Sequence, residues 1–64
     1  MAFYTVTLYD ADKTEIAVHH DVIGLKPAEK EARDMLADPE YKDSAHYVQV
    51  TNDNNVVVYD KFKR

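Results

Sequence analysis

The chain has 64 residues, of which 45% are hydrophobic and 31% charged, so it has the length and composition of one folded globular domain spanning residues 1–64. It contains no cysteine, which excludes disulfides and thiolate zinc sites. Its net charge of −4 argues against duplex nucleic acid as the main partner, because proteins that bind duplexes usually carry a basic patch.

The sequence shows no targeting or membrane signal. Met1 to Thr5 has no basic region and no long apolar run, so we expect no signal peptide. No stretch approaches 18 consecutive apolar residues, so we expect no membrane span. These features predict a cytoplasmic protein that does not associate with membranes.

Two alternating segments predict an N-terminal β-hairpin. Phe3–Tyr9 and Thr14–Ile23 follow the period of two that is typical of strands, and the polar stretch 10–13 between them has turn composition. On the first strand, Val6 and Leu8 share one face. On the second, the expected inner face carries Ile16, Val18, His20 and Val22. Because Val22 and Ile23 are adjacent apolar residues, a bulge near the end of this strand would shift the register.

An apolar stripe predicts one amphipathic helix in the middle of the chain. Its members follow helical spacing and are Ala28, Ala32, Met35 and Leu36. Pro27 suits the first turn of a helix, and Pro39 ends the helix near Asp38. Asp38 followed by proline also suits the start of a further short turn through Tyr41.

A second hairpin is predicted from Ala45 to Phe62. Ala45–Thr51 alternates, with His46, Val48 and Val50 on one face, and the stretch 52–55 is a strong turn of asparagine and aspartate. Val56–Phe62 is the last strand, and its three consecutive valines leave the buried face open. Residues 61–64 form a basic tail.

The resulting fold class is α+β. We predict a single small domain of order β-β-α-β-β, in which two hairpins form an antiparallel sheet and one amphipathic helix packs on one face. The expected core consists of Val6, Leu8, Ile16, Val18, Ala32, Met35, Leu36, Val48 and Val50.

The stretch from Ala28 to Tyr59 resembles several families of short bacterial and phage-encoded proteins of unknown function. The resemblance is carried by Ala28, Ala32, Arg33, Val48, Val50, the Asn-rich turn and the segment Val56–Tyr59. It implies a bacterial or phage origin and no particular activity.

The histidines are the candidates for a metal site. His19 and His20 are adjacent on a strand and therefore point to opposite faces. His20 and His46 both fall on predicted inner faces, where they could meet beside Asp21 or Asp60 and bind zinc or iron. No tight ligand spacing supports such a site, so we interpret these histidines as ordinary sheet residues and expect no metal.

Catalytic motifs are missing from the sequence. The aspartate-rich stretch 10–21 has Glu15 where a calcium-binding EF-hand requires glycine, and its composition is that of a hairpin turn. The only serine, Ser44, is not flanked by glycine, and a single glycine cannot build a phosphate-binding loop. We therefore expect no catalytic residues, no cofactor and no enzymatic activity.

The predicted outer face of the sheet is the candidate binding surface. It is rich in tyrosine and poor in charge, which is typical of protein interfaces. Its expected members are Phe3, Thr5, Thr7, Tyr9, Tyr47, Gln49 and Tyr59. The alternative interpretation is that a sheet with one helix simply has a partly apolar outer face.

Two functions follow from this surface. The first is a non-catalytic protein-interaction module that self-associates as a homodimer and acts as a bacterial or phage regulator or inhibitor. The dimer would form through the aromatic face or an edge strand, since Phe3–Tyr9 and Ala45–Thr51 lack the lysines that guard edges. The alternative is a single-stranded nucleic-acid-binding module that stacks bases on the aromatic face and uses the tail residues Lys61, Lys63 and Arg64.

Overall fold

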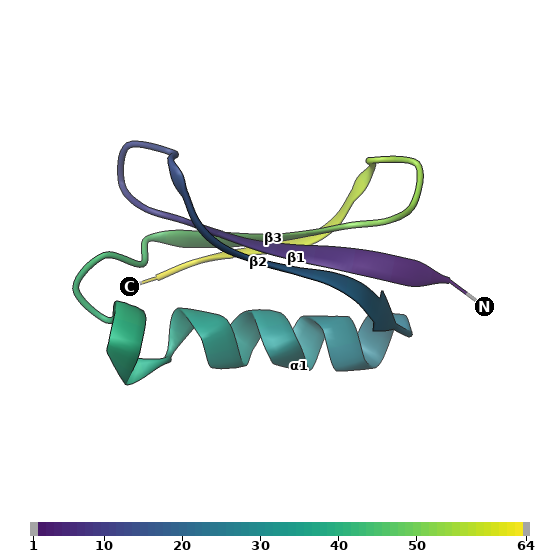
Figure 1. Ribbon diagram of the computed structural model, residues 1–64, viewed down its shortest axis with the longest axis horizontal. Helices are drawn as coiled ribbons and strands as arrows, with labels where there is room; N and C mark the ends of the chain where they lie inside the picture. Colours follow the sequence, from purple (N-terminus) through teal and green to yellow (C-terminus); the bar gives the residue numbers. More distant parts are fainter. Residues whose placement is uncertain (1, 64) are drawn as a thin grey trace.

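The computed structural model describes residues 2–63, in which four antiparallel strands form one sheet and a single helix covers one of its faces (Figure 1). The elements are β1 (Phe3–Tyr9), β2 (Glu15–Ile23), α1 (Leu25–Leu36), β3 (Tyr47–Thr51) and β4 (Val57–Phe62). The strand order in the sheet is β2-β1-β3-β4. The predicted α+β fold with the order β-β-α-β-β is confirmed.

The core lies between α1 and the two central strands. Val6 and Leu8 of β1 and Val48 and Val50 of β3 alternate toward the helix, and all four side chains are fully buried. The remaining buried apolar residues are Ala28, Ala32, Met35, Leu36 and Ala45. The spacing of these residues on strands and helix explains why most of the core was predictable from the sequence.

The start of α1 depends on Gly24. This residue has a φ of 94°, a conformation that side-chain-bearing residues rarely adopt, and a Cβ atom here would lie 3.2 Å from Cδ of Pro27. The Gly24 carbonyl accepts a hydrogen bond from the amide of Ala28 at 3.1 Å, so the helix begins at Leu25, two residues before the predicted start at Pro27.

The predicted short turn after the helix is confirmed as a 3₁₀ turn, Pro39–Tyr41. The Asp38 carboxylate accepts a hydrogen bond from the amide of Glu40 at 2.8 Å and so caps this turn. The turn carries the chain from the end of α1 toward β3.

Strand β2 contains a register shift that overturns the predicted faces of two residues. Tyr4 pairs with Val22, but Val6 pairs with His19, so β2 has one residue more than β1 in this stretch. Asp21, in that stretch, has a φ of 60°. The shift places His19 on the helix side and puts Val18 and His20 on the outer face, so their predicted inner-face positions are wrong and Val18 is not part of the core.

A second irregularity lies at the start of β2. Leu8 pairs with Ala17 and Tyr9 with Glu15, so Ile16 has no direct partner on β1. Ile16 is half-buried against the core rather than fully buried as predicted.

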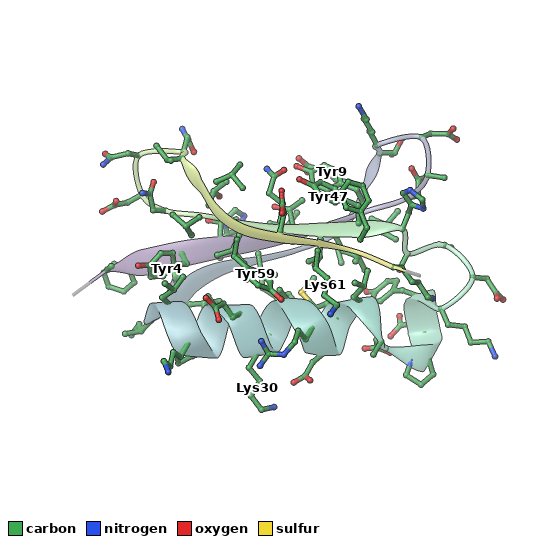
Figure 2. The ribbon with its side chains drawn as sticks, turned by 180° about the vertical axis from the view of Figure 1, so that it is seen from behind. Tyr4, Tyr9, Lys30, Tyr47, Tyr59 and Lys61 are labelled. Carbon is green, nitrogen blue, oxygen red and sulfur yellow. The ribbon has the colours of Figure 1, made fainter. Side chains whose placement is uncertain are left out.

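Strand β4 carries a third irregularity, which reassigns its aromatic residues. Val50 pairs with Tyr59 and Thr51 with Val57, so Val58 is the extra residue. Tyr59 consequently packs against the core on the helix side, and its predicted place on the outer face is wrong (Figure 2). Phe62, which pairs with Tyr47, is the aromatic residue of β4 on the outer face. Of the predicted basic tail, Arg64 lies outside the described residues.

The core assignment predicts the effect of truncating Leu36. Leu36 is 5% exposed, so Leu36→Ala should lower the free energy of unfolding by about 2–5 kcal/mol, through lost burial and the cavity left behind. Urea unfolding followed by circular dichroism measures this change. Leu25→Ala is the matched control, because Leu25 is 38% exposed and the same truncation there should cost much less. Equal losses for the two variants would contradict the assignment.

The backbone at Asp21 predicts a stabilising substitution. Because glycine adopts a positive φ without a Cβ clash, Asp21→Gly should raise the free energy of unfolding by up to about 1 kcal/mol. Asp21→Val, which places a β-branched side chain in the same conformation, should lower it. If urea unfolding ranks valine above glycine at this position, the bulge is absent in solution.

Candidate interaction surface

The face of the sheet that α1 leaves uncovered gathers most of the residues predicted to form an interface. Thr5, Thr7 and Tyr9 of β1 alternate with the helix-facing residues of that strand and pair with Thr51, Gln49 and Tyr47 of β3. Thr7 is only 7% exposed, although it lies on the face away from the helix. Six of the seven predicted residues therefore share this face, and they are Phe3, Thr5, Thr7, Tyr9, Tyr47 and Gln49. Their role in binding stays a prediction.

Three aromatic rings cross this face from strand to strand. The ring centroids of Tyr9 and Tyr47 lie 5.6 Å apart, and those of Tyr47 and Phe62 lie 4.5 Å apart, both in tilted arrangements. We call Tyr9, Tyr47 and Phe62 the aromatic ladder. Figure 2 shows Tyr9 and Tyr47 together on the side of the sheet away from the helix. Phe62 is 58% exposed, so the ladder ends in an open apolar ring beside solvent.

The phenol of Tyr47 is held in place by polar neighbours. Its hydroxyl lies 2.9 Å from Oε1 of Gln49 and 3.3 Å from Oδ2 of Asp60, to which it donates. Burial of the phenol, followed by the negative charge of Asp60, raises the pKa of Tyr47 above its ordinary value. The two hydrogen-bond acceptors on the same side of the ring orient the phenol of the central ring of the ladder.

An open hollow of about 430 Å³ adjoins the ladder. Its lining residues are Tyr9, Asp10, Ala11, Lys13, His46, Tyr47, Gln49 and Phe62. The turn at its rim is ordered by Asp10, whose carboxylate accepts hydrogen bonds from the amides of Asp12 and Thr14, each at 2.9 Å. The hollow thus combines an aromatic wall with a structured polar rim.

The two histidines considered as metal ligands do not meet. His20 lines a second hollow, of about 400 Å³, together with Thr5 and Thr51, whereas His46 packs edge-on against Phe62 at a centroid distance of 6.0 Å. Within residues 2–63, no group of three or more histidine, aspartate or glutamate side chains is placed to hold a metal ion. The predicted inner-face meeting is wrong for two reasons. Strand β1 lies between β2 and β3, and the register shift in β2 turns His20 outward. The predicted inner-face position of His46 is also wrong, because His46 lines the hollow beside the aromatic ladder.

The edges of the sheet differ from the sequence-based expectation. The two lysine-free segments on which that expectation rested form β1 and β3, which are the central strands, so their composition says nothing about edge pairing. Strand β2, which is an edge strand, also lacks lysine. The actual edge strands, β2 and β4, both contain register irregularities, which discourage pairing with another chain. Binding through the aromatic face or through an edge stays a prediction.

Neither a membrane-spanning helix nor a similar known protein points to a function for this chain. In the part of the chain that the structure describes, no helix combines the length and apolar character needed to cross a bilayer. No protein-family model, curated protein or solved structure matches this chain, so its own surface carries the functional evidence.

Proposed function

We propose that this protein is a cytoplasmic, non-catalytic protein-interaction module that forms a homodimer through the outer face of its sheet. The observation that carries the proposal is the aromatic ladder of Tyr9, Tyr47 and Phe62, which lies on the face that α1 leaves open. Aromatic residues are enriched and charged residues depleted at the centres of protein interfaces. The absence of cysteine fits a reducing compartment.

The distribution of polar groups on this face supports an interface. Farther along the two central strands from the ladder, this face carries the uncharged Thr5, Thr7 and Gln49, whereas charged groups such as Lys13 and Glu15 line the hollows at its margin. Asp60 is the charged group beside the ladder, and the Tyr47 hydroxyl already donates a hydrogen bond to it. A charge-poor centre with a polar rim is the usual anatomy of a protein interface.

A second copy of the chain suits this face for two reasons. A twofold axis brings a surface against itself, and an aromatic, charge-poor surface meets its own copy without like-charge repulsion. In addition, a chain of this size buries only about 60% of the surface that its unfolded form exposes, so association adds stability that the core cannot supply. The dimer would be two packed sheets with a helix on each outer side. Such a dimer suits a regulator or inhibitor that acts by binding.

The homodimer predicts a specific response to charge introduced at the ladder. Sedimentation equilibrium at high micromolar concentration should give twice the 7.4 kDa chain mass. Tyr9→Asp and Tyr47→Asp should each return the mass to that of the monomer, because each would bury an unpaired carboxylate. Lys26→Gln is the matched control, since it changes the net charge by the same single unit at an exposed position on α1 and should leave the dimer intact.

Two results would contradict this proposal. The first is a monomer mass for the unmodified protein across the concentration range. The second is a dimer that persists in both tyrosine variants, which would move the contact to an edge strand. Circular dichroism of each variant verifies that loss of the dimer is not loss of the fold.

A second candidate function is single-stranded nucleic-acid binding. It is favoured by one observation, which is that Lys61 and Lys63 lie beside Phe62 at the end of the ladder, so that stacked bases and phosphates would have adjacent partners. The net charge of −4 opposes it. Binding to a fluorescent oligonucleotide that weakens steeply with salt would support this function, and no binding at low salt would remove it.

A further inference from the structure

A second surface lies on the other side of β4, where the strand approaches the end of α1. A shallow hollow of about 200 Å³ is lined there by Arg33, Leu36, Ala37, Lys61, Phe62 and Lys63. We call this hollow the basic groove. It borders the aromatic ladder at Phe62 but faces the helix side of β4, since Lys61 pairs with the buried Val48 and its side chain lies toward α1 in Figure 2.

The charge of the groove contrasts with the rest of the chain. Its three ionisable side chains, Arg33, Lys61 and Lys63, are all cationic, although the protein as a whole has twelve acidic and eight basic residues. The ion pairs found within residues 2–63 are His19–Glu31 and Lys30–Asp34, and neither involves the groove. The groove is therefore a site of concentrated positive charge on an acidic protein.

Helix electrostatics explains only part of this cluster. Arg33 lies in the last turn of α1, where a cation interacts favourably with the helix dipole. Lys61 and Lys63 come from β4 and the residue after it, and they reach the same helix end from another element. The Lys63 ammonium donates a hydrogen bond to the Lys42 carbonyl, whereas no hydrogen bond or ion pair of the Lys61 side chain is found within residues 2–63. Bringing them beside Arg33 places like charges together, an arrangement that becomes favourable when an anionic group binds between them.

The floor of the groove is apolar. Leu36 is almost fully buried beneath it, Ala37 is exposed at the helix end, and Phe62 is 58% exposed. The long methylene stems of lysine and arginine extend such an apolar surface while their charged ends remain in water. A ligand that complements the groove needs an apolar group for the floor and negative charges on both sides of it.

We propose that the basic groove binds an acidic peptide segment in which carboxylate side chains flank one large apolar residue. The carboxylates would pair with Arg33 and Lys61, and the apolar side chain would lie against Leu36 and Phe62. Charge complementarity selects the acidic character of the segment, and the apolar floor selects a protein segment over a phosphate chain. This binding site lies beyond the proposed dimer interface and does not require the dimer to form.

The test is a nuclear magnetic resonance titration with the capped peptide Glu-Asp-Phe-Asp-Glu. Backbone amide shifts should concentrate at Leu36, Ala37, Lys61 and Phe62, and they should diminish when salt rises from about 20 mM to about 200 mM. The peptides Gln-Asn-Phe-Asn-Gln and Glu-Asp-Gly-Asp-Glu, which lack the charges and the apolar group respectively, should each bind more weakly.

Variants of the groove give the quantitative result. Arg33→Gln and Lys61→Gln should each raise the dissociation constant about two- to fivefold, the effect of removing one partner of an exposed ion pair. Lys26→Gln, which removes one exposed cation at the other end of α1, should leave the dissociation constant unchanged. The same titrations in the Tyr9→Asp background should agree, because Tyr9 does not line the groove and the groove acts independently of the oligomeric state.

Three results would overturn the proposal. The first is an absence of shifts at the groove residues at low salt, and the second is an equal loss of affinity in Lys26→Gln. The third is binding of an oligothymidylate, but not of the acidic peptide, at the groove residues, which would assign the groove to phosphates instead.

Discussion

One helix packed on one face of a four-stranded sheet is the constraint on which the other features depend. The small residues Ala28 and Ala32 are fully buried where α1 meets the sheet, and Val6, Leu8, Val48 and Val50 complete the contact from the two central strands. Because no second helix exists within residues 2–63, the opposite face meets solvent or a partner. That face carries aromatic rings and threonines rather than the charged residues of an ordinary solvated sheet, and so it is the surface most in need of explanation.

The irregularities in the two edge strands, β2 and β4, bring side chains of those strands toward α1. The bulge in β2 turns His19 toward the helix, where it contacts the Glu31 carboxylate and links the edge strand to α1. In β4, the extra residue Val58 brings Tyr59 toward the core and leaves Phe62 on the outer face. Each irregularity thus improves the contact of an edge with the helix and also makes the edge a poor template for another strand. The proposed dimer therefore uses the free face rather than an edge.

Periodicity in the sequence predicted the elements, their order and most of the core, because local spacing decides which residues of a regular strand or helix share a face. The buried residues of β1, β3 and α1 follow this rule, for example Val6, Leu36 and Val50. The rule failed in β2, where one inserted residue reverses the alternation and exchanges the faces of His19 and His20. In β4 the three consecutive valines left the buried face open, and Tyr59 was wrongly placed on the outer face. The central position of β1 and β3 was also beyond local reasoning, since the pairing of Tyr9 with Tyr47 joins residues far apart in the chain.

The missed residue, Phe62, connects the two surfaces that the proposals involve. It is the last ring of the aromatic ladder and also part of the floor of the basic groove. In a face-to-face dimer the groove would stay open, because it lies on the helix side of β4, and the twofold axis would then present two such grooves. A partner with two acidic segments would bind both with an effective concentration set by the linker between them, and so more tightly than either segment alone.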